Sequence, residues 1–279
     1  MANKKTILVG AGHMGGALAA GWLANPSDGI RPEDLVILDP SPSDAVQELI
    51  TKYNLTHIEK LGLSEASGIG MVVLAIKPQM LDKVADGLKL ILPPDCTILS
   101  ILAGTPLKRL AELFGSRPII RAMPNTPASI GAGITVCVAN EAGEAHKQDA
   151  SKLMQVAGKV EWVEDERLIG PVTAVSGSGP AYVFLLAEAL AAAGFSEGLP
   201  RDLADKLARE TIIGAGALLA SDTKTPQELR RAVTSSGGTT QAALDVLMGG
   251  GGGLPELVRQ AVNAAERRSR KMATESNGR

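Results

Sequence analysis

The sequence predicts an α/β domain followed by an all-α domain, and two observations support this division. Up to about residue 165, short β-branched runs alternate with amphipathic stretches, which is typical of a parallel sheet covered by helices. Beyond that point the β-type runs disappear, and helical patterns follow one another. The chain has 279 residues, 45% of them hydrophobic, which is enough for two modest domains with buried cores.

We therefore expect an α/β domain at residues 1–164, an all-helical domain at 165–272 and a flexible tail at 273–279. The expected strands are Thr6–Val9, Leu35–Leu38, Met71–Ala75, Thr97–Ile101, Pro118–Arg121 and Ile134–Ala139. The helices expected between them are Met14–Ala24, Ser43–Lys52, Gln79–Leu90, Leu107–Phe114 and Glu144–Val156. The second domain is expected to contain Glu166–Ser176, Ala181–Ala193, Arg201–Ser221, Gln227–Val233, Thr240–Met248 and Pro255–Lys271.

The composition narrows the class of partner. Basic and acidic residues nearly balance, 28 against 30, and long runs of like charge are absent, which argues against nucleic acid or an anionic membrane. The first apolar run stops at Gly10, too early for a signal peptide, and we expect no segment able to span a bilayer. Cys96 and Cys137 lie in apolar runs and are expected to be buried thiols in a reducing compartment. We expect a soluble, cytoplasmic protein.

One helix predicts an oligomer. The stretch Ala181–Ala193 is apolar on every side except at Glu188, so it should be buried all round. A domain of about a hundred residues hides such a helix poorly by itself. We expect a homodimer in which helices of two chains interleave. The alternative is a central helix wrapped by its own neighbours.

A glycine motif predicts a nucleotide site. The strand Thr6–Val9 runs into Gly10-Ala11-Gly12-His13-Met14-Gly15, a helix follows, and Asp39 ends the next strand. This context is that of a dinucleotide-binding Rossmann domain. Gly10 permits the tight turn, Gly12 leaves room for the pyrophosphate and Gly15 lets helix and strand pack closely. The phosphates would meet free N–H groups at the start of the helix. The alternative is a glycine-rich turn without a ligand.

Asp39 is the position that usually discriminates between the two nicotinamide cofactors. An Asp there can accept a hydrogen bond from the ribose 2′-OH of NAD and would repel the 2′-phosphate of NADP. The turn that follows offers the hydroxyls of Ser41 and Ser43, which can surround a phosphate, although no Arg is close. The residues leave the choice undecided. His57 and His146 are interpreted as surface residues, and metal-ligand spacing is not evident, so no metal is expected.

Two later segments are rich in small polar residues. Ala174–Tyr182 is expected to be a glycine-serine turn that leads into the apolar helix. A loop at the start of another helix offers hydroxyls and N–H groups that can bind a carboxylate; its residues are Ser235, Gly237, Gly238, Thr239 and Thr240. Thr239 can equally well be a simple helix cap, and the pattern alone does not decide.

These segments carry a resemblance to a known family. The chain resembles pyrroline-5-carboxylate reductases, which catalyse the last step of proline biosynthesis, over nearly its whole length. The matching segments are Gly10–Gly15, Ala75–Pro78, Arg121–Pro127, Ser176–Tyr182 and Val233–Thr240. The resemblance implies a Rossmann domain and a helical domain that forms an intertwined dimer, which can assemble into larger rings. Departures are His13, where Asn is common, Asp39, which clouds the usual NADP assignment, and the five-glycine link Gly249–Gly253.

The resemblance also implies residue roles. The cofactor would be lined by the glycine loop and by Asp39, Ser41, Ala75, Ile76, Lys77, Pro78, Ala103 and Gly104. The residues Ser235, Gly237, Gly238, Thr239 and Thr240 would hold the substrate. NADPH is the expected cofactor, and NADH is an alternative. Thr240 is the candidate for hydrogen bonding to the imine nitrogen, with water as another proton source.

The implied chemistry agrees with the residue types. Hydride moves to the C=N carbon of a cyclic imine, which can arrive already protonated, so a strong general acid is not required. Catalysis can then depend mainly on positioning two rings face to face. A β-hydroxyacid dehydrogenase would need a Lys in the second domain, yet none lies between Val175 and Pro200. A non-catalytic NADP sensor would have no reason to keep the loop at Ser235–Thr240.

Overall fold

The computed structural model describes residues 5–24, 29–66 and 68–277. It divides into two compact units, Met1–Gly177 with Ala265–Arg279, and Ser178–Ala264. The sequence-based domain limits, 1–164 and 165–272, stay a prediction, because compact units within a single chain need not coincide with the domains of a dimer. The α/β class with a helical C-terminal part is confirmed.

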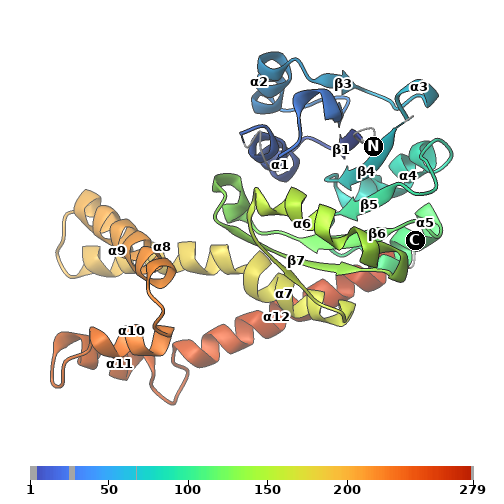
Figure 1. Ribbon diagram of the computed structural model, residues 1–279. Coiled ribbons are helices and arrows are strands. Elements are labelled where there is room, and N and C mark those ends of the chain that lie inside the picture. The colour runs from blue at the N-terminus through green and yellow to red at the C-terminus, as the bar shows by residue number, and fades with distance from the viewer. Residues whose placement is uncertain (1–4, 25–28, 67, 278–279) are drawn as a thin grey trace. The chain divides into compact units, whose positions relative to one another are not determined.

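The first unit contains a twisted eight-stranded sheet (Figure 1). Its strands are β1 Lys5–Val9, β2 Leu35–Leu38, β3 Thr56–Ile58, β4 Ile69–Leu74, β5 Thr97–Ser100, β6 Ile119–Met123, β7 Gly133–Ala139 and β8 Gly158–Trp162. Their order is β3-β2-β1-β4-β5-β6-β7-β8, and every neighbouring pair is parallel except β6 and β7. The inner strands β2 and β5 are fully buried, and β2 is apolar throughout, as expected where helices cover both faces of a parallel sheet.

Two hydrophobic clusters show which helices cover which face. Leu18 and Trp22 of α1 pack in one cluster with Met154 of α6, whereas Leu88 of α4 and Phe114 of α5 belong to the other. The helices of this unit are α1 His13–Ala24, α2 Asp44–Tyr53, α3 Leu63–Ala66, α4 Leu81–Leu88, α5 Leu107–Phe114, α6 Lys147–Gln155 and α7 Ile169–Val172. Neighbouring residues of one strand face opposite clusters, so both faces of the sheet are core.

The edge strands β3 and β8 were not expected from the sequence. Each has a buried neighbour on one side only, and most of its residues are exposed or half-buried. Such strands need no continuous apolar run, which is the signal that identified the inner strands. Cys96 and Cys137 are fully buried and form no disulfide with each other, as expected, and burial raises the pKa of Cys137 to about 12.

The second unit is helical. Its elements are α8 Gly179–Ser196, α9 Arg201–Ser221, α10 Pro226–Ala232, α11 Thr239–Leu247 and the first part of α12 Leu254–Asn277, whose end belongs to the first unit. The helix α12 continues through residues 273–277, for which the composition predicts a frayed tail. The last two residues of that tail, 278–279, lie outside the described residues.

The expected glycine-serine turn before α8 is wrong. Thr173–Gly177 forms a π-helical turn, so the chain stays helical from Glu166 to Ser196. By length and composition this 31-residue run could cross a membrane, which corrects the expectation that no segment can. The small residues after Ser176 predict a break in the helix, but the structure continues the helix through them to Ser196.

The other helices of its own unit leave the apolar surface of α8 exposed. Phe184 is 68% exposed and Leu185 is 63% exposed, and no residue of the helix is classed as buried. Ile213 and Leu218 of α9 are also more than half exposed. The alternative of a central helix wrapped by its own neighbours is therefore wrong for the single chain. Exposed apolar area of this kind marks an interaction surface.

Candidate active site

The glycine loop joins β1 to α1, and two of its glycines are required by packing. Gly10 has a φ of +91°, and a Cβ on it would lie 2.7 Å from the carbonyl oxygen of Ala75. A Cβ on Gly15 would overlap the carbonyl oxygen of Gly10. Both positions therefore need glycine for the close packing of helix and strand.

Gly12 differs from its two neighbours in the motif. It is exposed, and a Cβ built on it would meet nothing within 4 Å. The protein itself could accept a side chain here, so packing gives no reason for a glycine. A free approach to the backbone beside the N-terminus of α1 is what a pyrophosphate requires. The loop therefore fits a dinucleotide.

The predicted cofactor residues lie at the edge of the sheet formed by the carboxyl ends of β1, β2, β4 and β5. β1 lies between β2 and β4, so the chain adds strands first on one side of β1 and then on the other. Doubly wound folds bind ligands at such a switch in strand order. Ala75 and Ile76 follow β4 directly, and the Ala75 N–H donates to the Val9 carbonyl (2.8 Å). Lys77 is exposed and precedes the short 3₁₀ helix Pro78–Met80.

Ala103 and Gly104 follow β5 at the same edge. Gly104 has a φ of +69°, and a Cβ there would lie 2.9 Å from the Cβ of Met272 on α12. Pro78 and Ala103 also line a cavity of about 140 Å³ together with Met272 and Thr105. The glycine loop does not line this cavity, and its volume is far below the 300–1,000 Å³ typical of drug-sized ligand pockets. The cofactor residues therefore form an open edge rather than an enclosed pocket.

Asp39 connects the glycine loop to the loop after β2. Its Oδ2 accepts a hydrogen bond from the N–H of Ala11 (2.6 Å), and its Oδ1 accepts one from the N–H of Ser41 (2.8 Å). The Ser43 hydroxyl donates to the Ala11 carbonyl (3.4 Å). Ser43 precedes α2 without a side-chain capping bond, so its hydroxyl serves the glycine loop instead of the helix. The carboxylate is thus fixed beside the loop, where it would meet the adenosine ribose.

Two histidines that were interpreted as surface residues make internal contacts. The Nε2 of His57, on β3, lies 2.8 Å from the carbonyl oxygen of Asp39. The Nδ1 of His146 lies 3.0 Å from the hydroxyl of Thr97, at the start of β5. Both interpretations are corrected, because both side chains are half-buried. His13, in the glycine loop, is exposed.

The segment Arg121–Pro127 uses its polar side chains to hold the sheet together. Arg121 is buried and pairs with Glu166 at 2.8 Å, and the same Glu166 oxygen accepts from the N–H of Leu107 (2.8 Å). The Asn125 side chain accepts from the N–H of Ile134 (2.9 Å), the second residue of β7. These contacts explain Arg121 and Asn125 by structure alone.

The predicted substrate loop lies in the second unit, between α10 and α11. The N–H of Gly238 donates to the carbonyl of Ser235 (3.1 Å), and Gly237 between them has a φ of +70°. A Cβ on Gly238 would overlap the Ser235 hydroxyl. Ser235–Gly238 thus forms a tight turn in which the positive φ of Gly237 favours glycine, while a side chain at Gly238 would displace the Ser235 hydroxyl.

The turn ends at the first residue of α11. The N-cap is Gly238, which offers no side-chain capping bond, and Thr239 is already inside the helix. Thr239 is therefore not the simple cap that the sequence left as an alternative. The first N–H groups of α11 have no hydrogen-bond partner within the helix, as at every helix start. The helix dipole at this end favours an anion. The loop fits a carboxylate.

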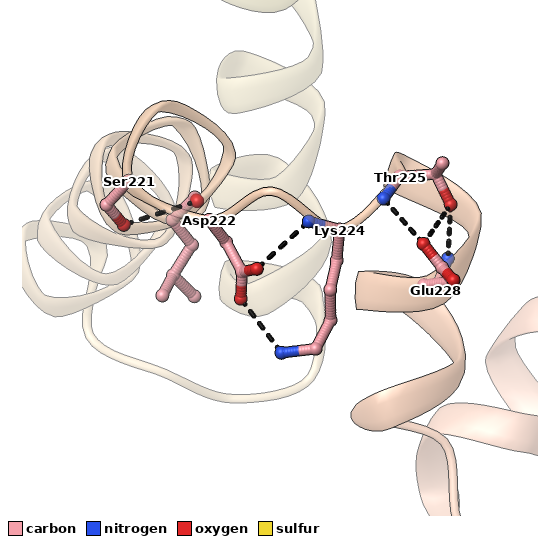
Figure 2. Close-up of polar contacts among 6 residues, drawn as sticks. Ser221, Asp222, Lys224, Thr225 and Glu228 are labelled. Atoms are coloured by element: carbon pink, nitrogen blue, oxygen red, sulfur yellow. Dashed lines mark hydrogen bonds and ion pairs between the residues drawn. The ribbon is translucent and has the colours of Figure 1, made fainter.

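The helix α10 is anchored before this loop (Figure 2). Thr225 and Glu228 form a reciprocal capping box, which lowers the pKa of Glu228 through hydrogen bonds from the Thr225 hydroxyl and N–H. In the loop between α9 and α10, Asp222 accepts hydrogen bonds from the backbone N–H and the side chain of Lys224, which lower the pKa of Asp222. These contacts fix the start of the helix that carries the loop.

Comparisons with known proteins agree across both parts of the chain. Residues 166–272 match the family model for pyrroline-5-carboxylate reductase dimerisation, and residues 5–104 match that for NADP oxidoreductase, coenzyme F420-dependent. A pyrroline-5-carboxylate reductase of Pseudomonas aeruginosa is 37% identical over 275 residues, 98% of each chain. A solved pyrroline-5-carboxylate reductase of Coxiella burnetii has a TM-score of 0.88 at 33% identity, covering 97% of this chain and 99% of its own. That of Plasmodium falciparum, with NADP bound, has a TM-score of 0.80 at 30% identity and covers 98% and 99%. The chain belongs to the pyrroline-5-carboxylate reductase family.

Proposed function

We propose that this chain reduces 1-pyrroline-5-carboxylate to L-proline with NAD(P)H, the last step of proline biosynthesis. One observation carries the proposal: a single chain combines the open glycine loop with the Ser235–Thr240 loop, and a reductase relative matches it over both. NAD(P)H supplies a hydride from C4 of its nicotinamide ring. Everything else required of the protein is binding, orientation and the handling of one proton.

We assign the first of these tasks to the open edge of the sheet. The N–H groups at the start of α1 bind the pyrophosphate, and Asp39 and Ser41 face the adenosine ribose. Ala75, Ile76, Lys77 and Pro78, with Ala103 and Gly104, follow the two neighbouring strands and flank the nicotinamide half. The full proposed cofactor set is Gly10, Ala11, Gly12, His13, Met14, Gly15, Asp39, Ser41, Ala75, Ile76, Lys77, Pro78, Ala103 and Gly104.

The substrate is assigned to the turn before α11. Its carboxylate binds N–H groups and hydroxyls of Ser235, Gly237, Gly238 and Thr239. The Thr240 hydroxyl forms a hydrogen bond with the imine nitrogen, as donor to the neutral imine and as acceptor from the protonated one. A cyclic imine that arrives protonated already accepts hydride well, so neither Thr240 nor water needs to be a strong acid. Half-buried Thr240 in a small-residue loop is sufficient for this role.

A coupled assay tests the proposed reaction. NADPH oxidation should depend on added pyrroline-5-carboxylate, and proline should form in equal amount. A β-hydroxyacid dehydrogenase would instead reduce NADP⁺ with a hydroxyacid. Reduction of NADP⁺ by hydroxyacids, or binding of NADPH without any formation of proline, would contradict the proposal.

The loop residues have a testable effect on the imine half of the reaction. Ser235→Ala and Thr240→Ala should each lower kcat/KM for the imine about tenfold or more, because a lost hydrogen bond to a charged group costs about 1.5–3 kcal/mol. Cofactor affinity, measured by fluorescence titration, should stay close to that of the wild type. Thr234→Ala is a matched control, since the Thr234 hydroxyl already donates to the backbone carbonyl of Arg230 in α10 (2.7 Å). An unchanged kcat/KM in both loop variants would refute the substrate role.

Cofactor preference is a separate prediction. We propose that NADPH is preferred and that Asp39 leaves appreciable activity with NADH. Asp39→Ser should raise the ratio of kcat/KM for NADPH over NADH, because it removes a negative charge beside the 2′-phosphate. Asp39→Asn also removes the charge, but it keeps one acceptor oxygen, so one of the two hydrogen bonds from Ala11 and Ser41 can remain. A similar rise of the ratio in both variants assigns the effect to the lost charge. If neither variant changes the ratio, Asp39 does not face the ribose.

The assembly follows from the apolar helices. The chain forms a homodimer through residues 166–272, and we propose that dimers assemble further into a ring and that the enzyme is cytoplasmic. The apolar run Glu166–Ser196 lies within this dimerisation segment, which favours a second chain over a membrane as its cover.

A further inference from the structure

His57 lies beside the residue on which cofactor preference depends. Its Nε2 is 2.8 Å from the carbonyl oxygen of Asp39. A carbonyl oxygen only accepts hydrogen bonds, so Nε2 must carry the proton and donate it. In the neutral ring this leaves Nδ1 unprotonated. A second proton can therefore enter the ring without breaking the contact to Asp39.

The backbone holds His57 firmly at this place. β3 pairs with β2 in parallel, with Leu38 opposite Ile58, and the N–H of Asp39 donates to the carbonyl of Ile58 (3.2 Å). The imidazole and this backbone bond thus fix both polar groups of the Asp39 peptide. The Asp39 carboxylate is fixed in turn by Ala11 and Ser41.

Charged side chains also lie at the ends of the elements next to His57. Asp39 follows β2, α2 begins with Asp44, and Glu59 and Lys60 follow β3. The glycine loop contains a second histidine, exposed His13. His57 is the one of these groups in direct hydrogen-bond contact with Asp39 among the described residues.

We propose that His57 is a positioning residue that makes cofactor preference depend on pH. This inference rests on the proposed cofactor site. When the imidazole is neutral, the negative charge of Asp39 is unopposed, and the ribose diol of NAD(H) is accepted relatively well. When Nδ1 is protonated, a positive charge beside Asp39 offsets that carboxylate, and the 2′-phosphate of NADP(H) is repelled less. Preference for NADP(H) therefore rises as the pH falls.

Direct binding of NAD⁺ and NADP⁺ tests this without catalysis. Calorimetric Kd values at about pH 6.5 and about pH 8.5 bracket the range in which histidines titrate. In the wild type, the ratio Kd(NAD⁺)/Kd(NADP⁺) should rise on acidification. One added charge within about 10 Å near a protein surface changes affinity about threefold or more. The 2′-phosphate also takes up a proton near pH 6, so the comparison that counts is between proteins at the same pH.

Three variants separate charge from position. His57→Gln keeps an N–H donor for the Asp39 carbonyl but cannot be charged, so its ratio at the lower pH should fall about threefold below that of the wild type. His57→Lys carries its charge at both pH values, so its ratio should already be high at the higher pH. His146→Gln is the control, because His146 also makes a single hydrogen bond, to Thr97 at the amino end of β5. Its Kd ratio should match that of the wild type at both pH values.

The outcomes divide cleanly. A wild-type-like ratio in both His57→Gln and His57→Lys at both pH values overturns the proposal. A loss of the pH effect in His13→Asn, with His57→Gln unchanged, assigns the effect to His13 and also overturns it. Failure of the folded wild type to bind either nucleotide would instead refute the proposed cofactor site. Binding with the expected ratios supports His57, whatever the imine substrate proves to be.

Discussion

Gly12→Val is expected to abolish binding of NADPH and NADH while leaving the fold intact. The reason is the open space at this position: a Cβ there meets nothing within 4 Å, so the side chain would extend into the volume of the pyrophosphate. Fluorescence titration should show no saturable binding, while circular dichroism and the melting temperature remain close to those of the wild type. Turnover should be lost with binding.

Gly15→Ala is the matched comparison within the same loop. Its Cβ would overlap the carbonyl oxygen of Gly10, so this variant should lose stability before it loses any specific contact with the cofactor. The two substitutions therefore separate a functional glycine from a packing glycine. Unchanged cofactor affinity in Gly12→Val would mean that the loop binds something else.

Mixing two inactive variants is expected to restore activity. The exposed apolar residues of α8 and α9 lie in the segment that matches the dimerisation family model. We predict that two chains pair through them and that the glycine loop of one chain then faces the Ser235–Thr240 loop of its partner. Gly12→Val disables the first loop, and the double variant Ser235→Ala/Thr240→Ala disables the second. In a hybrid dimer one site collects both defects and the other collects none.

The expected recovery can be calculated. Random exchange makes half of the dimers hybrid, each with one intact site of two, so about a quarter of wild-type activity should return. The control is the double variant mixed with a chain carrying all three substitutions, which cannot form an intact site. If each site is built within one chain, activity stays at the residual level of the variants, although hybrid dimers are shown to be present.

The sequence predicted the inner strands and the glycine loop because their signals are local. A buried strand of β-branched residues, a glycine turn and a following helix occupy consecutive positions, as in β1 and α1. The edge strands β3 and β8 have no such run, since only one side of each is paired. Their pairing is decided by residues far away in the chain.

The network around Asp39 was missed for the same reason. The contact from Asp39 to Ala11 joins residues 28 positions apart, and that from His57 to Asp39 joins residues 18 apart. No spacing rule connects such positions, so His57 was interpreted as a surface residue. The strand β3, which brings it to Asp39, was itself not predicted.

The segment before α8 was missed for a different reason. Its glycines and serines favour turns, but Ser176 and Thr173 donate their hydroxyls to carbonyls four residues earlier, at Val172 and Ile169. These bonds satisfy the two hydroxyls inside the helix, so neither residue needs a turn to find a partner. A residue-by-residue preference for turns therefore did not predict this segment.

Transfer of an isotope tests the proposed reaction most directly. NADPH carrying deuterium at C4 of the nicotinamide, in the transferred position, is incubated with the enzyme and 1-pyrroline-5-carboxylate, and the proline is analysed by mass spectrometry. We predict one deuterium per proline, on the ring carbon that was double-bonded to nitrogen, and its absence in Gly12→Val. Proline without deuterium, or oxidised cofactor without proline, would contradict hydride transfer to the imine by this chain.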